Sequence, residues 1–154
     1  MSTSSTDRIA KRAELKAPVA RVWRALTDYR EFGSWFGVKL ESPFAPGKPT
    51  RGPLTVSGYE HLTMEVVVQR MEPERLFSFH WHPHAVDGKV DYSKESPTLV
   101  EFLLEPSATG TLLVVTESGF DAVPASRRSE AFRMNDQGWG KQMKAIEAYV
   151  GKTP

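Results

Sequence analysis

The fold is decided by residues 18–36, which read PVARVWRALTDYREFGSWF. Pro18 suits the first position of a helix, where its missing N–H would have no partner. Apolar side chains then recur at intervals of three and four residues, which places them on one helical face. They are Val19, Val22, Trp23 and Leu26. The pattern predicts an amphipathic helix that begins at the proline.

A second, shorter helix should follow directly. Asp28 and Glu31 have the spacing of a capping pair at a helix start, and the segment GSWF at 33–36 marks the end of this helix. Two adjoining helices ahead of a series of strands should lie across the mouth of a curved sheet. We therefore expect residues 18–36 to close one end of that sheet.

The middle of the chain carries strand signals. Short runs rich in apolar and β-branched residues are separated by turns that contain proline or glycine. The predicted strands are 8–16, 54–59, 61–71, 76–82 and a hairpin of 98–105 and 111–119, with at most a short one near 38–41 inside a loop at 37–53. Consecutive strands with short links pair antiparallel.

Residues 124–150 are predicted to form one long helix. Side chains spaced by three and four residues form a continuous stripe along it. The stripe is Phe132, Asn135, Trp139, Met143, Ile146 and Val150. Gly138 and Gly140 flank Trp139, and each costs the helix about 1 kcal/mol relative to alanine. That cost suggests the close approach of another backbone, or a kink that aims the indole ring.

The order of elements predicts an α+β fold, in which a curved antiparallel sheet of six to seven strands wraps around the long C-terminal helix. Side chains alone do not easily fill the space between such a sheet and helix, so a cavity is expected there. The length of 154 residues fits one domain, which we place at 8–151 behind a flexible tail at 1–7.

Composition excludes several classes of function. The net charge is +1, with 20 basic and 19 acidic residues interspersed, which argues against nucleic-acid binding. The pair Arg127-Arg128 is interpreted as a solvated helix face. Cysteine is absent, so there is no disulfide, thiol nucleophile or thiolate metal site. Residues 1–6 lack a secretory apolar run and no stretch has membrane-spanning length, so we expect a cytoplasmic protein without integral membrane association.

Four segments occur in a characteristic order: PVARVWRALTD…WF, EPERLFSFHW, VEFLLEPSATGTLLVVTESGF and GWGKQMKAIEAYV. Together they resemble the activator of heat-shock-protein-90 ATPase, C-terminal-domain-like family, within the START/Bet v 1-like (SRPBCC) superfamily. The resemblance covers residues 8–150 and implies a helix-grip fold with a hydrophobic cavity between sheet and helix. Members of the superfamily include lipid carriers, hormone receptors, polyketide cyclases and a co-chaperone domain.

Candidate cavity residues come from the helix pair, the strands and the long helix. On the strand 76–82, Phe77, Phe79 and Trp81 alternate onto one face, which should point toward the helix. Core packing and cavity lining overlap for such aromatic residues. The predicted lining is Trp35, Phe36, Phe79, Trp81, Phe102, Leu104, Leu113, Val115, Glu117, Phe132, Asn135, Trp139 and Met143.

Two polar residues stand among these apolar positions. The alternation of 111–119 leaves open which face points inward; the resemblance favours Leu113, Val115 and Glu117. An inward Glu117 could act as a general acid or base, or hold a polar ligand group; otherwise it is an exposed residue at a strand end. Asn135 must be paired, with a backbone carbonyl as one candidate, or must contact ligand or water.

The remaining motifs favour binding over catalysis. His80, His82 and His84 alternate along one strand, but Pro83 interrupts them and their face is the solvent one, so we expect exposed histidines, no metal and no cofactor. Nucleotide, metalloprotease and hydrolase motifs are absent. The first hypothesis is a carrier of a small hydrophobic or amphipathic ligand, monomeric or homodimeric. The alternatives are a chaperone-cofactor-like interaction module and a cyclase- or hydratase-type enzyme that uses Glu117.

Overall fold

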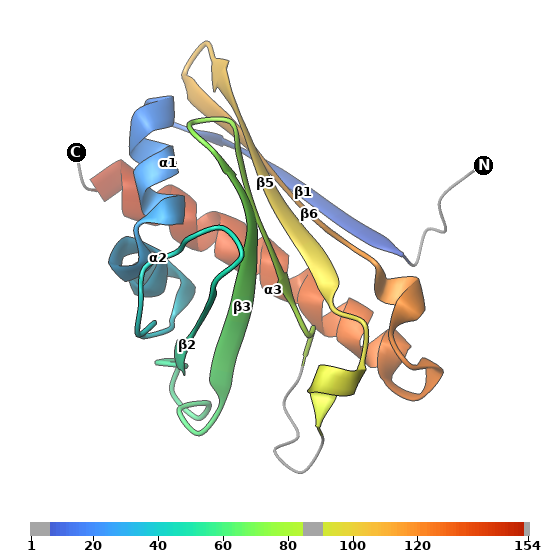
Figure 1. The fold of residues 1–154 in the computed structure, drawn as a ribbon. Helices are drawn as coiled ribbons and strands as arrows, with labels where there is room; N and C mark the ends of the chain where they lie inside the picture. The colour runs from blue at the N-terminus through green and yellow to red at the C-terminus, as the bar shows by residue number, and fades with distance from the viewer. Residues whose placement is uncertain (1–6, 85–90, 153–154) are drawn as a thin grey trace.

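An antiparallel sheet and a long helix packed on it form the two layers of the molecule (Figure 1). The computed structural model describes residues 7–84 and 91–152. Within these residues the sheet has six strands in the order β1-β6-β5-β4-β3-β2. The strands are β1 (Arg8–Leu15), β2 (Pro49–Pro53), β3 (Thr63–Glu72), β4 (Leu76–Trp81), β5 (Thr98–Ser107) and β6 (Gly110–Ser118). The α+β helix-grip architecture predicted from the sequence is confirmed.

The helices are α1 (Val19–Thr27), α2 (Tyr29–Phe36) and α3 (Ala125–Lys152), with short 3-10 helices η1 (Tyr92–Lys94) and η2 (Phe120–Ala122). Figure 1 shows α1 and α2 beside the C-terminal half of α3, at one end of the sheet. Helix α3 crosses the sheet and contacts β1 (Figure 1). Among the described residues, no helix combines the length and the apolar character needed to cross a bilayer.

Helices α1 and α2 begin close to the positions that the sequence predicts. Pro18 is the cap before α1 rather than its first residue, and its carbonyl accepts from the N–H groups that follow. The Asp28 carboxylate accepts from the N–H of Arg30 at 2.9 Å and of Glu31 at 3.2 Å, which caps α2. Of the predicted capping pair, only Asp28 caps the helix, because the Glu31 carboxylate instead accepts from Arg21 at 2.8 Å.

The edge strand β2 differs from the prediction, which assigned a loop to 37–53 and a strand to 54–59. Residues 49–53 are the strand, and its two prolines stand at its ends, which an edge strand tolerates. The segment after α2 lies alongside, where the N–H of Lys39 donates to the Pro53 carbonyl. A Cβ on Gly52 would overlap the Lys39 carbonyl oxygen at 1.9 Å, so this close approach requires glycine.

Aromatic side chains fill much of the space between the sheet and the helices. On β4, Phe77 and Phe79 are fully buried on the inward face, as the alternation predicts. Ring contacts join residues of α2, β4, β5 and α3 into one group, with centroids 4.8–6.4 Å apart. This aromatic cluster comprises Phe32, Phe36, Phe77, Phe79, Trp81, Phe102 and Trp139. It joins the sheet, α2 and α3 across the core.

Candidate functional site

A fully buried carboxylate lies at the edge of the aromatic cluster. Glu117 is near the end of β6, and its side chain is on the inward face with Leu113 and Val115; all three have an exposed fraction of 0%. The opposite residue on β5 is Val100, so the carboxylate lies among apolar strand positions. A charge at such a place requires compensation by hydrogen bonds or by an opposite charge.

Four side chains donate hydrogen bonds to the Glu117 carboxylate. The indole Nε1 of Trp139 donates to Oε1, and the indole Nε1 of Trp81 donates to Oε2, each at 2.7 Å. The Thr98 hydroxyl donates to Oε2 at 2.5 Å. The Asn135 amide nitrogen lies 3.0 Å from Oε1 and 3.2 Å from Oε2. All four donors are neutral, so the carboxylate is held by dipoles alone.

These contacts make Glu117 an anchor for the two tryptophans. An indole N–H can only donate, so each bond directs the N–H edge of its ring toward the carboxylate. The rings of Trp81 and Trp139 are 5.7 Å apart, and Phe36 lies 6.0 and 6.1 Å from them. The result is a rigid aromatic wall formed by residues from three different elements.

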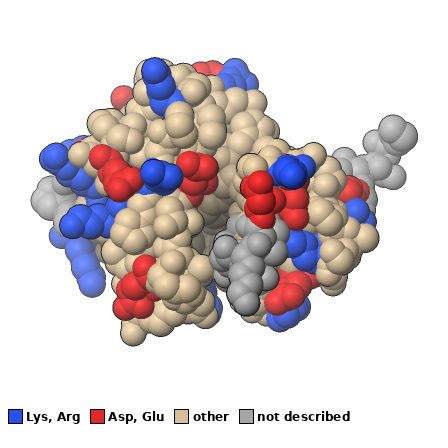
Figure 2. Space-filling model, turned by 60° about the horizontal axis from the view of Figure 1, so that its bottom comes forward, with Lys and Arg blue, Asp and Glu red and all other residues tan. Residues whose placement is uncertain are grey.

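Two adjoining cavities meet at this aromatic wall. The larger has a volume of about 470 Å³ and the smaller about 170 Å³, and Phe36, Trp81 and Asn135 line both. The larger cavity is bounded by the segment from Leu54 to the start of β3, the end of β4 and η1. Those segments lie at the lower end of the molecule in Figure 1, and Figure 2 shows this end hollowed between two lobes.

Asn135 brings a hydrogen-bond acceptor to both cavities. Its amide orientation is determined by Glu117, because a carboxylate accepts and the amide must present its nitrogen there. The carbonyl Oδ1 therefore points away from the carboxylate. It accepts no hydrogen bond from the described residues, and it is not among their buried polar atoms without a partner. Oδ1 is thus available to a donor in the cavity.

The outer part of the larger cavity is polar. It is lined by His82, His84, Asp91, Tyr92 and Ser93. The hydroxyl and the N–H of Ser93 both bond to Asp91 and lower the pKa of that carboxyl below its ordinary value. The His82 Nε2 lies 3.0 Å from the Glu95 carbonyl oxygen; because a carbonyl only accepts, this nitrogen donates.

Arg127 fixes this outer wall to α3. Its guanidinium donates to the Glu95 carboxylate at 2.6 and 2.9 Å and to the Pro83 carbonyl at 2.7 Å, and it lies over the ring of Tyr92 at 4.8 Å. The interpretation of this arginine as a solvated helix residue is wrong, because its side chain is only 19% exposed. The neighbouring Arg128 donates to the Val123 carbonyl.

The three histidines of the strand end do not converge. His82 bonds to Glu95, and the His84 Nε2 lies 3.6 Å from a Glu130 carboxylate oxygen. The His80 Nδ1 is buried without a partner among the described residues. Over the described parts of the chain, no group of three or more histidine, aspartate or glutamate side chains could hold a metal ion. All three histidines are partly buried rather than exposed, so the expectation of exposed histidines is wrong.

The structure divides the predicted cavity residues into two groups. Phe36, Trp81, Asn135 and Trp139 line one or both cavities. The others lie in the core behind the aromatic wall or beside it, and Phe132 packs against Phe120 at 5.1 Å. These core residues are Trp35, Phe79, Phe102, Leu104, Leu113, Val115 and Met143, together with the buried Glu117.

Sequence reasoning missed Thr98 and the β3 side of the site. The side chain of Thr98 lies on the inward face of β5, together with those of Val100 and Phe102. The same alternation that predicts an inward Phe102 therefore also predicts an inward Thr98. Met64 occupies the equivalent inward phase of β3 and lines the larger cavity.

The expected close backbone approach at the two helix glycines is wrong. A Cβ on either Gly138 or Gly140 would meet nothing within 4 Å. Gly138 lines the smaller cavity, whereas Gly140 lines neither of the two that meet at the aromatic wall. Both positions thus have room for a side chain, but only Gly138 borders a cavity at the aromatic wall.

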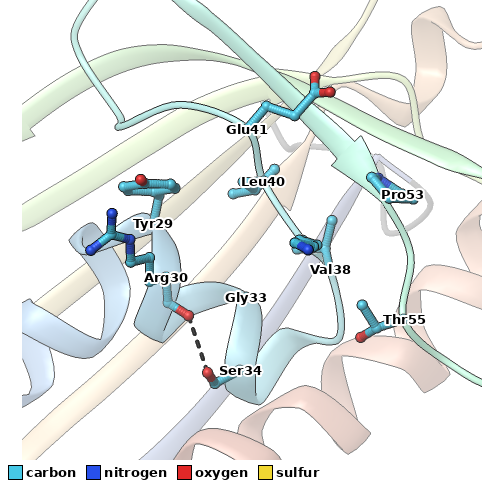
Figure 3. Close-up of a pocket in the computed structure, with 10 residues that line it drawn as sticks. Tyr29, Arg30, Gly33, Ser34, Val38, Leu40, Glu41, Pro53 and Thr55 are labelled. Carbon is cyan, nitrogen blue, oxygen red and sulfur yellow. Dashed lines mark hydrogen bonds between the residues drawn. The ribbon is translucent and has the colours of Figure 1, made fainter.

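A third depression, of about 870 Å³, lies outside the aromatic wall between α2 and the segment after it. Figure 3 shows Tyr29 and Arg30 on one side and Val38, Leu40 and Glu41 on the other. The charged ends of Arg30 and Glu41 point away from each other there, and the dashed bond joins Ser34 to the Arg30 carbonyl. Its polar groups do not converge on one point, so it is a weaker candidate than the paired cavities.

Comparisons with solved structures give the same fold. A protein from Mesorhizobium loti is 24% identical, with a TM-score of 0.74 over 96% of this chain and 98% of that one. A protein from Nitrosomonas europaea is 17% identical, with a TM-score of 0.76 over 97% of each chain. DynU16, from the dynemicin biosynthetic locus, is 25% identical, with a TM-score of 0.70 over 94% of this chain and 47% of that one.

A comparison with curated proteins found no match. The family model described as Activator of Hsp90 ATPase homolog 1-like protein matches residues 16–151, which include both helices of the N-terminal pair, β2 to β6 and nearly all of α3. That match includes Glu117 and its four donors, so the resemblance first apparent in four short segments extends over the whole site. The chain belongs to the Activator of Hsp90 ATPase homolog 1-like family.

Proposed function

We propose that the protein binds a small amphipathic ligand in the paired cavities. The observation that carries the proposal is their meeting at three residues, where two aromatic rings and the Asn135 carbonyl oxygen are available together. Concave, mostly apolar sites with a few oriented polar groups are typical of small-molecule binding. The fold supports this function, and DynU16 belongs to a biosynthetic locus.

The anchored tryptophans favour binding because they are already ordered. Contact with an apolar ligand contributes about 25 cal/mol per Å² of apolar surface buried. Ordering a mobile side chain on binding costs about 0.5–1.5 kcal/mol. Trp81 and Trp139 avoid most of this cost, since Glu117 holds both indoles before a ligand arrives.

The two alternative functions have less support from the geometry. A general acid or base must reach the substrate within hydrogen-bond distance, whereas Glu117 lies behind the indoles and accepts from four donors. An interaction module that works through its surface predicts an exposed apolar or charged patch and no accessible pocket. The exposed large apolar side chains that the structure describes are scattered over the 54–62 loop, β3, β5 and α3: Val56, Tyr59, Val67, Leu103 and Met134.

A pair of matched helix substitutions tests the proposal. Gly138→Leu places a side chain in the smaller cavity, and Gly140→Leu makes the same change two residues away, outside both cavities. The probe is N-phenyl-1-naphthylamine, a neutral aromatic amine whose fluorescence rises in apolar sites. We expect the wild-type protein and Gly140→Leu to bind one probe per chain.

Gly138→Leu should bind the probe at least about tenfold more weakly, the equivalent of about 1.4 kcal/mol. Native mass spectrometry of the freshly purified protein provides a second measurement, since a co-purifying small molecule should be retained by Gly140→Leu and lost from Gly138→Leu. Equal probe affinity in both variants, or no probe binding to the wild-type protein, would contradict the proposed function.

A further inference from the structure

The charge distribution around the cavities indicates the chemical class of the ligand. We propose that the ligand is an amphipathic organic cation, with an ammonium group beside Asn135 and an apolar part against the aromatic wall. This inference rests on the proposed function, because it specifies the occupant of the same cavities. It follows from three observations: the charge of Glu117, the faces of the indole rings, and the charges of the cavity lining.

The Glu117 carboxylate lacks a cationic partner among its hydrogen-bond donors. Buried charges in proteins are normally paired with an opposite charge or bound to a metal, yet Trp81, Thr98, Asn135 and Trp139 are all neutral. Three of these donors also line the cavities, so one residue separates the carboxylate from the cavity space. Its negative charge therefore acts on the cavity across a short, weakly screened distance.

The faces of the two indole rings also favour a positively charged ligand. The face of an aromatic ring carries negative electrostatic potential and attracts cations, tryptophan most strongly. Each N–H that donates to a carboxylate polarises its ring and makes the face more electron-rich, as hydrogen-bonded groups polarise one another. Both Trp81 and Trp139 donate to Glu117 in this way, and both line the smaller cavity.

The polar groups of the cavity lining likewise favour a positively charged ligand. Asn135 presents a carbonyl oxygen, which accepts from an ammonium N–H and repels a carboxylate. Asp91 supplies a further carboxylate, and the described lining residues include neither lysine nor arginine. Glu65 also lines the larger cavity and stands opposite Arg51 in the register of β2 and β3, but it is exposed to solvent, so it adds little.

The basic side chains near the outer wall already have partners. Arg127, which lies over Tyr92, has its charge compensated by Glu95 at 2.6 Å. The His84 ring faces Glu130 at 3.6 Å. The His82 ring donates from Nε2 to a carbonyl oxygen. An anionic ligand would therefore lie near Asp91 and close to Glu117. Among the described lining residues, no guanidinium or ammonium group would compensate its charge.

A series of ligands with one tail and three head groups tests the inference. Octylamine, octanol and octanoate share an eight-carbon chain and are cationic, neutral and anionic near pH 7. Isothermal titration calorimetry with the wild-type protein should give the tightest binding for octylamine. Because a cation over an aromatic face is attracted to it, we expect octylamine to bind at least about tenfold more tightly than octanol, the equivalent of about 1.4 kcal/mol. Octanoate should bind most weakly.

A matched pair of variants locates the head group. Asn135→Leu removes the acceptor and should weaken octylamine about tenfold, as loss of a hydrogen bond to a charged group does. Gln137→Leu deletes an amide on the exposed side of the same helix and should leave the affinity unchanged. Equal reduction in both variants would place the ammonium group elsewhere and overturn the inference.

The ligand series separates the two proposals. If octanol or octanoate binds as tightly as octylamine, the inferred cation preference is wrong, while the proposed ligand-binding function stands. If none of the three binds and N-phenyl-1-naphthylamine does not bind either, the proposed function is wrong and the inference falls with it.

Discussion

At the scale of single residues, Glu117 shows how a protein can bury a carboxylate without a cation. Removing a charge from water costs several kcal/mol even after relaxation. Five hydrogen-bond contacts from neutral donors compensate part of that cost. The arrangement depends on acceptor chemistry, because both indole N–H groups need an oxygen opposite them and neither can accept.

We predict that Glu117→Gln destabilises the protein although it preserves size and shape. The new amide must place its NH₂ group where either Oε1 or Oε2 was, so it will face the indole of Trp139 or of Trp81. An unpartnered buried donor costs about 1–3 kcal/mol. Urea denaturation should show this loss in the free energy of unfolding. Glu105→Gln, at an exposed position of β5, is the control and should change it by less than about 0.5 kcal/mol. A Glu117→Gln variant as stable as this control would contradict the anchoring role.

At the scale of secondary-structure elements, one polar cluster joins all three α-helices. The Glu31 carboxylate of α2 pairs with Arg21 and Arg24 of α1, each at 2.8 Å, and accepts from the Tyr149 hydroxyl of α3 at 2.9 Å. The Arg21 guanidinium also lies over the Tyr149 ring at 5.2 Å. Since α2 carries Phe36, this cluster determines where the helix pair presents its part of the aromatic wall.

The loss of stability in Tyr149→Phe should depend on pH, because the Tyr149 hydroxyl belongs to this cluster. Burial, together with the hydrogen bond to Glu31, raises the pKa of Tyr149 above its ordinary value. A raised folded-state pKa contributes stability that is fully present below the unfolded pKa of about 10 and is lost as the pH rises through the folded pKa. At pH 7 the variant should lose about 0.5–1.5 kcal/mol of unfolding free energy. Above about pH 10 the difference from wild type should shrink.

The measurement for Tyr149→Phe is urea unfolding at neutral pH and above the ordinary tyrosine pKa. Tyr59→Phe is a suitable control, because Tyr59 is 52% exposed and its hydroxyl has no hydrogen bond among the described residues. Its difference from wild type should be less than about 0.5 kcal/mol. A Tyr149→Phe difference that stays constant through the alkaline range would show that the phenol does not titrate differently in the folded state.

At the scale of the whole molecule, periodicity predicts the fold but not the contacts of the site. The spacing of apolar residues predicts α1, α3 and the β5–β6 hairpin, because these elements bury one regular face. Periodicity does not predict strand β2, because its two prolines are typical of a loop and are tolerated only because β2 is an edge strand. The convergence of Thr98 and Asn135 on Glu117 depends on how α3 crosses the sheet, which no local pattern specifies.

The aromatic cluster leads to a prediction for the molecule as a unit. Its rings come from α2, β4, β5 and α3, so none of these elements can separate without exposing large apolar side chains from the others. We expect residues 8–151 to unfold in one cooperative step, as single domains of about this size usually do. Urea titrations followed by far-ultraviolet circular dichroism and by tryptophan fluorescence should have the same midpoint and slope. The four tryptophans report the core and, through Trp81 and Trp139, the site, whereas the far-ultraviolet signal reports the helices and the sheet. If the fluorescence midpoint falls at a lower urea concentration, the packing around the tryptophans is lost before the secondary structure, and the single-domain prediction is wrong.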